Sequence, residues 1–187
     1  MKIDFHQTIK SLYWANQVAL MHLACIDAYS GINALHIIFN QEAKPFIIAS
    51  ILAHQKSLAQ DVYKIFDKEY TGKNLNCSFL RLRHQLQEES VNNEKITNQV
   101  LEEADSLVKI QKVALPTDIR NKLIAHNDYE KLGEDVVIDI EPMKYFLLQL
   151  DKYLVGLLNT LYDKNVYQYD YDKAKMIYKF GILDYTH

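Results

Sequence analysis

The stretch PMKYFLLQLDKYLVGLLNTL, residues 142–161, decides the fold class of this chain. Its apolar side chains recur every three or four positions, which is the spacing of one face of an α-helix. Pro142 suits the start of such a helix, because its fixed φ is helical and a first-turn N–H is not needed there. The apolar face comprises Met143, Phe146, Leu147, Leu150, Leu154, Leu157, Leu158 and Leu161. A face this broad predicts a long helix in the core of a helical bundle.

The preceding part of the chain repeats this periodicity. Residues 4 to about 39 predict one long helix, or two helices with a break near Ser30-Gly31. Residues 45 to about 68 predict a second helix. Ser78 is a candidate N-cap for a shorter helix, and a further long stripe runs from Ile96 to Ala114.

With only five Gly and three Pro, the chain has few turns, so long elements with short loops are expected. We therefore predict an all-α fold, an up-and-down bundle of five to seven helices, as a single domain over residues 1–187.

The remaining segments carry weaker patterns. Residues 136–140 form the only strand-like run in the sequence, which favours an extended connector over a sheet. Residues 71–76 predict a polar loop, and residues 142–163 predict the final helix. The tail after them, rich in Tyr and Asp, predicts a partly packed edge, with a partner-binding surface as the alternative.

Composition narrows the class of protein. Apolar residues make up 49% of the chain and charged residues 24%, as in ordinary soluble domains. The net charge of −3 argues against non-specific coating of nucleic acid, which needs many cationic phosphate contacts. Cys25 and Cys77 give neither a disulfide framework nor a metal cluster, and they fit a reducing, cytoplasmic compartment. The N-terminus lacks a signal-peptide layout, and polar residues interrupt the most apolar run, residues 18–39, so no membrane span is expected.

One polar string stands out between the last two predicted long helices. It reads RNKLIAHND, from Arg120 to Asp128, and it contains one of only three arginines in the chain. Thr117 or Asp118 can cap a helix through this string. On such a helix Arg120 and His126 lie about 120° apart and roughly 9 Å along the axis. A long Arg side chain can still converge with the imidazole on one site.

This string, within a helical layout, resembles the HEPN (higher eukaryotes and prokaryotes nucleotide-binding) superfamily, and in particular its abortive-infection-type branch. The resemblance implies an HEPN-like helical bundle with Arg120 and His126 as catalytic residues and Asn121 at the polar position after the Arg. Several HEPN toxins carry a Tyr two positions after the His. Here Asp128 occupies that position and Tyr129 follows it. Lys122 and Tyr129 are candidate RNA-binding residues.

The activity implied by the resemblance is metal-independent endoribonuclease cleavage in a toxin or antiviral-defence (abortive-infection) protein. An imidazole can move the proton of a ribose 2′-hydroxyl, and a guanidinium can hold the phosphate. Products would carry 2′,3′-cyclic phosphate ends, and neither a metal nor a cofactor is required. The resemblance also implies a homodimer and a possible antitoxin of the nucleotidyltransferase type. RNA is the expected substrate.

Other basic and histidine residues have plainer explanations. Arg81 and Arg83, with His84, form a small basic cluster that is either a solvated face or a second RNA contact. His54 lies on an apolar stripe, which favours a core histidine with satisfied hydrogen bonds, and the same holds for His22 and His36. A second reading of the whole chain remains open, in which it is a non-catalytic helical module for dimerisation or partner binding and Arg120 and His126 are structural.

Overall fold

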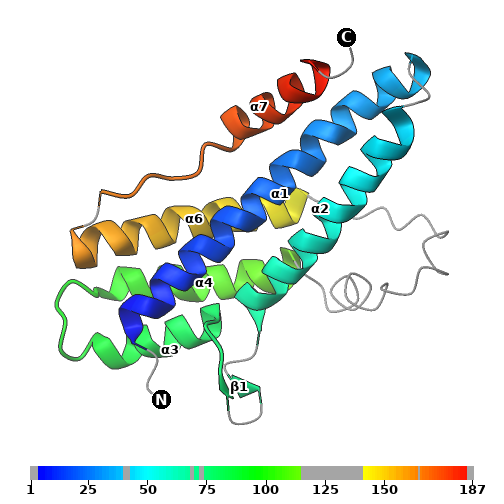
Figure 1. The fold of residues 1–187 in the computed structure, drawn as a ribbon. Helices are drawn as coiled ribbons and strands as arrows, with labels where there is room; N and C mark the ends of the chain where they lie inside the picture. The colour runs from blue at the N-terminus through cyan, green and yellow to red at the C-terminus, as the bar shows by residue number, and fades with distance from the viewer. Residues whose placement is uncertain are drawn as a thin grey trace.

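The structure is a computed structural model that describes residues 4–39, 43–67, 70–71, 74–114, 141–163 and 165–184. Within these ranges the chain forms six helices and one pair of two-residue strands (Figure 1). The elements are α1 (Phe5–Phe39), α2 (Ala43–Phe66), β1 (Tyr70–Thr71), β2 (Asn74–Leu75), α3 (Phe79–Glu89), α4 (Asn98–Ala114), α6 (Glu141–Tyr162) and α7 (Tyr171–Asp184). The prediction of an all-α bundle of five to seven helices is confirmed for the described part of the chain.

α1 is the longest helix and contacts α2, α3, α6 and α7 (Figure 1). It continues without a break through Ser30 and Gly31, so the one-helix alternative is correct. A glycine inside a helix costs about 1 kcal/mol relative to alanine. Burial of the preceding turns, where Leu23 and Ile26 are almost inaccessible to solvent, offsets that cost, since each buried aliphatic side chain contributes about 1.5–3 kcal/mol.

α6 confirms the pattern of residues 142–161. Every predicted apolar position is buried except Leu161, which packs partly against the core. α4 lies beside α6 and runs antiparallel to it. The Tyr153 hydroxyl donates to the Val100 carbonyl at 3.0 Å, and Lys95, before α4, lies 3.8 Å from Asp163, after α6. The end of α4 and the start of α6 therefore lie at the same end of this helix pair.

A buried carboxylate joins α1 to α6. Asp151 on α6 is only 2% exposed. It accepts hydrogen bonds from Asn16 Nδ2 at 3.4 Å, from Gln17 Nε2, and from the backbone N–H of Tyr169 at 2.7 Å. Burial raises the pKa of Asp151, while these donors oppose the rise because they stabilise the ionised form. The contact fixes α1, α6 and the segment before α7 relative to one another.

The prediction that residues 142–163 form the final helix is wrong, because α7 follows. Asp170 begins α7 by accepting the backbone N–H of Lys173 on Oδ1 at 3.0 Å, which satisfies one of the unpaired donors of a first turn. α7 lies along α1 (Figure 1). Tyr171 is buried and Tyr178 packs partly against the core, whereas Tyr167 is 73% exposed, so the Tyr-rich tail does form a partly packed edge.

The predicted polar loop at residues 71–76 contains a short hairpin instead. β1 pairs with β2 in antiparallel register, Tyr70 opposite Leu75 and Thr71 opposite Asn74. The strand-like run at residues 136–140 lies outside the described residues. None of the helices in the described ranges is both long enough and apolar enough to cross a membrane.

Replacing the buried carboxylate tests the α1–α6 junction. Asp151→Ala leaves buried donors without an acceptor, which we expect to lower the free energy of unfolding by about 3 kcal/mol. For a chain of this size, that corresponds to a Tm lower by about 6–12 °C in calorimetry. The exposed neighbour Lys152 supplies the control, since Lys152→Ala should change Tm by less than about 2 °C. Equal effects of the two substitutions would contradict the role given to Asp151.

Candidate functional site

The predicted catalytic residues Arg120, Asn121 and His126, together with Lys122 and Tyr129, lie outside the described residues. Their roles therefore stay predictions. The structure does place the two helices that flank this stretch. α4 ends at Ala114, which is buried, and α6 begins at Glu141. Because α4 and α6 are antiparallel, both flanks lie at one end of the helix pair, which we call the open end.

An ion cluster fixes the first turn of α6 at the open end. Asp27 on α1 accepts Lys175 Nζ at 2.8 Å and lies 3.6 Å from Lys144 Nζ. The Tyr171 hydroxyl donates to the same carboxylate at 3.4 Å, and Lys144 Nζ lies 4.7 Å from the Tyr171 ring centroid. Burial, and then the charge of Asp27, raise the pKa of Tyr171 and keep its hydroxyl protonated. This Asp27 cluster ties α6 and α7 to α1.

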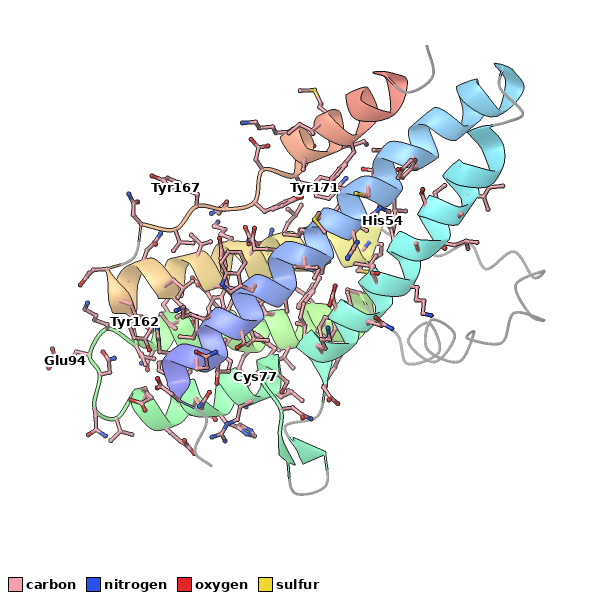
Figure 2. All side chains as sticks on the ribbon, viewed as in Figure 1. His54, Cys77, Glu94, Tyr162, Tyr167 and Tyr171 are labelled. Atoms are coloured by element: carbon pink, nitrogen blue, oxygen red, sulfur yellow. The ribbon has the colours of Figure 1, made fainter. Side chains whose placement is uncertain are left out.

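A second polar cluster lies between α1 and α2. His22 Nδ1 and His54 Nδ1 are 2.8 Å apart, and His22 Nε2 lies 3.7 Å from Asp61 Oδ2. Figure 2 shows His54 pointing from α2 towards α1. The prediction of core histidines with satisfied hydrogen bonds is met only in part, because each imidazole is bonded to the other while both are only partly buried. Sequence reasoning did not find this pairing, because 32 positions separate the two residues and no local spacing signals it. The side chain of His36 lies outside the described residues.

The basic cluster of α3 is the one predicted RNA contact that the structure describes. Ser78 caps α3, and its hydroxyl accepts the backbone N–H of Arg81 at 3.3 Å. Arg83 Nε donates to Asp105 on α4, and this hydrogen bond lowers the pKa of Asp105. Asp105 lies roughly 14 Å along α4 from Ala114, at 1.5 Å per residue, so this contact is distant from the open end. Because Arg83 already binds a carboxylate of the neighbouring helix, an RNA contact by Arg81 or Arg83 stays a prediction.

A groove of about 530 Å³ runs between α4 and α6 on the bundle surface. Leu107 and Leu157 contribute to an apolar floor, while Lys152 and Glu103 lie at its polar rim. Gly156 widens it, because a Cβ there would meet no atom within 4 Å. Across the described ranges, no three or more His, Cys, Asp or Glu side chains are grouped to hold a metal ion.

The helical bundle, together with the sequence Arg120 to Asp128 between α4 and α6 in the chain, is typical of an HEPN-type domain. A comparison with protein families agrees. The family model HEPN_AbiU2, described as AbiU2, matches residues 16–176, which include Arg120 to Asp128. The chain belongs to this family, an abortive-infection-type HEPN family. No curated protein and no solved structure shows significant similarity to the chain.

Asp27→Asn tests how the Asp27 cluster holds α7. The substitution removes the shared partner of Lys144 and Lys175, which are partly exposed, so solvent screening limits the loss to about 1 kcal/mol. We expect amide hydrogen exchange in α7 to become about fivefold faster, with exchange in α4 unchanged. Glu141→Gln is the matched control, because Glu141 contacts the same Lys144 at 3.7 Å from an exposed position and should leave α7 unaffected. Unchanged exchange in α7 of Asp27→Asn would reject the cluster as its anchor.

Proposed function

We propose that the chain is a metal-independent endoribonuclease that acts in abortive-infection defence. Membership of the HEPN AbiU2 family supports the defence role. The observation that carries the nuclease is the string Arg120 to Asp128 in a member of this family. The string supplies a guanidinium, an amide and an imidazole within seven residues. A guanidinium can hold the phosphate, and an imidazole can move the proton of the ribose 2′-hydroxyl.

The reaction follows from the substrate's own nucleophile. The ribose 2′-oxygen attacks the adjacent phosphorus while a neutral imidazole takes its proton, and the bond from phosphorus to the 5′-oxygen breaks. A protonated imidazole supplies the proton to that leaving oxygen. Arg120 and Asn121 stabilise the charge on the phosphate oxygens, while Lys122 and Tyr129 contact neighbouring nucleotides. The products are a 2′,3′-cyclic phosphate and a 5′-hydroxyl.

RNA cleavage by the purified chain should persist in EDTA and leave 2′,3′-cyclic phosphate ends. We expect Arg120→Ala and His126→Ala each to lower the rate by at least about 100-fold, because each removes a group that acts in the transition state. End-labelled RNA on denaturing gels measures the rate and the ends. His6→Gln, on α1 and outside every proposed RNA contact, is the control for loss of an imidazole, and Tm confirms folding. Cleavage that survives the double substitution of Arg120 and His126 would disprove this function.

The same chemistry favours a homodimer. One imidazole cannot be base and acid in the same step, whereas a two-fold axis near Arg120 to Tyr129 brings two Arg and two His to one cleft. The proposed interface includes residues 120–129. A nucleotidyltransferase-type antitoxin is a further proposed partner.

The chain should therefore sediment at about twice its mass of 21.9 kDa at micromolar concentration. Mixing wild-type chains with an excess of His126→Ala chains should lower the wild-type activity, because a mixed cleft keeps two Arg but only one His and so lacks either the base or the acid. A catalytically active monomer would contradict the shared cleft. So would a mixture that forms mixed dimers and keeps the full activity of its wild-type chains.

The alternative function is a non-catalytic module for partner binding, and the groove between α4 and α6 favours it. An apolar floor with a polar rim suits an amphipathic helix from a partner. This reading expects no RNA cleavage at any protein concentration. It also expects His126→Ala to lower Tm or weaken dimerisation, so the nuclease assay and the Tm measurement distinguish the two functions.

A further inference from the structure

The histidine pair between α1 and α2 has no part in the proposed nuclease. The two imidazoles approach through their Nδ1 atoms at 2.8 Å, with ring centroids 5.1 Å apart. They are partly buried, the His22 side chain being 15% exposed. Such a contact needs one N–H donor and one free lone pair, because two bare nitrogens or two N–H groups repel each other. The distance therefore limits how many protons the pair can hold.

Counting protons gives the limit. In the neutral pair, His54 Nδ1–H donates to His22 Nδ1, and His22 Nε2–H points towards Asp61 at 3.7 Å. The pair can take one added proton without losing the contact. His22 then carries a proton on Nδ1 and on Nε2, the latter beside the Asp61 carboxylate. His54 carries its proton on Nε2, so that its Nδ1 accepts from His22. A second added proton places hydrogen on both facing Nδ1 atoms. The contact then becomes a repulsion between two cations, and the rings must separate.

Within the described ranges, no further carboxylate faces the pair to compensate a second charge. Asp61 is the only carboxylate acting on the pair among the described residues, and its Oδ1 already binds Lys64 Nζ at 3.0 Å. The Tyr29 ring lies 6.2 Å from the His54 ring. Lys144 of α6 and Lys175 of α7 bind Asp27, which is about 140° round α1 from His22 at 100° per residue.

Burial lowers the pKa of both imidazoles. Asp61 partly opposes this shift at His22, whereas His22 adds to it at His54. The folded pair is therefore neutral at neutral pH. Because the folded pKa values lie below the ordinary value of about 6.5, the contact contributes its full stability above that pH. The contribution is lost as the pH falls below it, where the separated imidazoles bind protons more readily.

We propose that His22 and His54 form a one-proton latch, which holds α2 against α1 while the pair carries at most one added proton and releases it when both imidazoles are protonated. The latch makes the α1–α2 pair the acid-sensitive part of the bundle. α4 provides an internal reference, because it contains no histidine and, unlike α6 with Asp151, no buried carboxylate. The latch does not depend on the proposed nuclease, and its test needs no RNA.

Hydrogen exchange at pH 7.5 and 5.5, corrected for the intrinsic rates, measures the opening of each helix. The equilibrium constant for local opening should increase about tenfold from pH 7.5 to pH 5.5 when opening exposes one imidazole to protonation. It should increase about 100-fold when opening exposes both. We expect exchange in α2 to increase by about 10- to 100-fold and exchange in α4 by less than about threefold. Equal increases in α2 and α4 would overturn the proposal.

Variants assign the effect to the pair. His54→Gln keeps a hydrogen-bonding side chain that cannot take a proton, so the increase in α2 should fall to at most about tenfold. Adding His22→Asn should reduce it to that of α4, while His84→Gln should retain the wild-type increase. A double variant with the wild-type increase would reject the latch.

Nitrogen NMR of the wild-type imidazoles gives a second readout if the double variant does not fold. At pH 7.5 one Nδ1 of the pair should be protonated and the other bare. Two bare Nδ1 atoms would mean that the hydrogen bond does not exist, and the proposal would fail. Two protonated imidazoles at pH 5.5 with unchanged exchange in α2 would overturn it as well.

Discussion

The fold depends on the buried carboxylate of Asp151. Apolar burial holds α1 against α6, but it is non-directional and does not by itself select one register. Hydrogen bonds are directional, and Asp151 takes them from Asn16 and Gln17 on α1 and from the backbone of Tyr169. One side chain thus sets the register of two helices and the point where the chain turns back towards α7. Burying the Asp151 carboxylate costs hydration free energy, and the three donors offset this cost because their hydrogen bonds replace those to water.

The same arrangement recurs along α1. Asn16 and Gln17 meet α6, His22 meets α2, and Asp27 meets both α6 and α7. These polar contacts point in different directions round the helix, because residues five or six positions apart project from different faces. α1 is therefore fixed in rotation as well as in position. This explains how one 35-residue helix can serve as the common partner of four others.

Periodicity predicted the elements whose apolar faces are wide, such as α6, and Ser78 identified the start of α3. Apolar periodicity did not predict α7. Its inward-facing residues Tyr171, Ala174 and Tyr178 are interleaved with charged side chains and form only a narrow apolar stripe. Periodicity also missed the contacts of His22 and Asp27, which depend on how separate helices meet. For the proposed site the sequence supplies the residue types in the string at Arg120, while their mutual geometry lies outside the described residues.

The packing of α4 against α6 bears on the proposed catalytic site, because the sequence of that site lies between these two helices in the chain. Closing a segment costs less entropy when its ends are held close together than when they are free. Antiparallel packing holds the end of α4 and the start of α6 on the same side, and the Asp27 cluster fixes the latter on α1. The two helices that flank the proposed site are therefore fixed relative to each other and to α1. Fixed flanks matter for the proposed homodimer, because a symmetric cleft requires that each chain present its half in the same way.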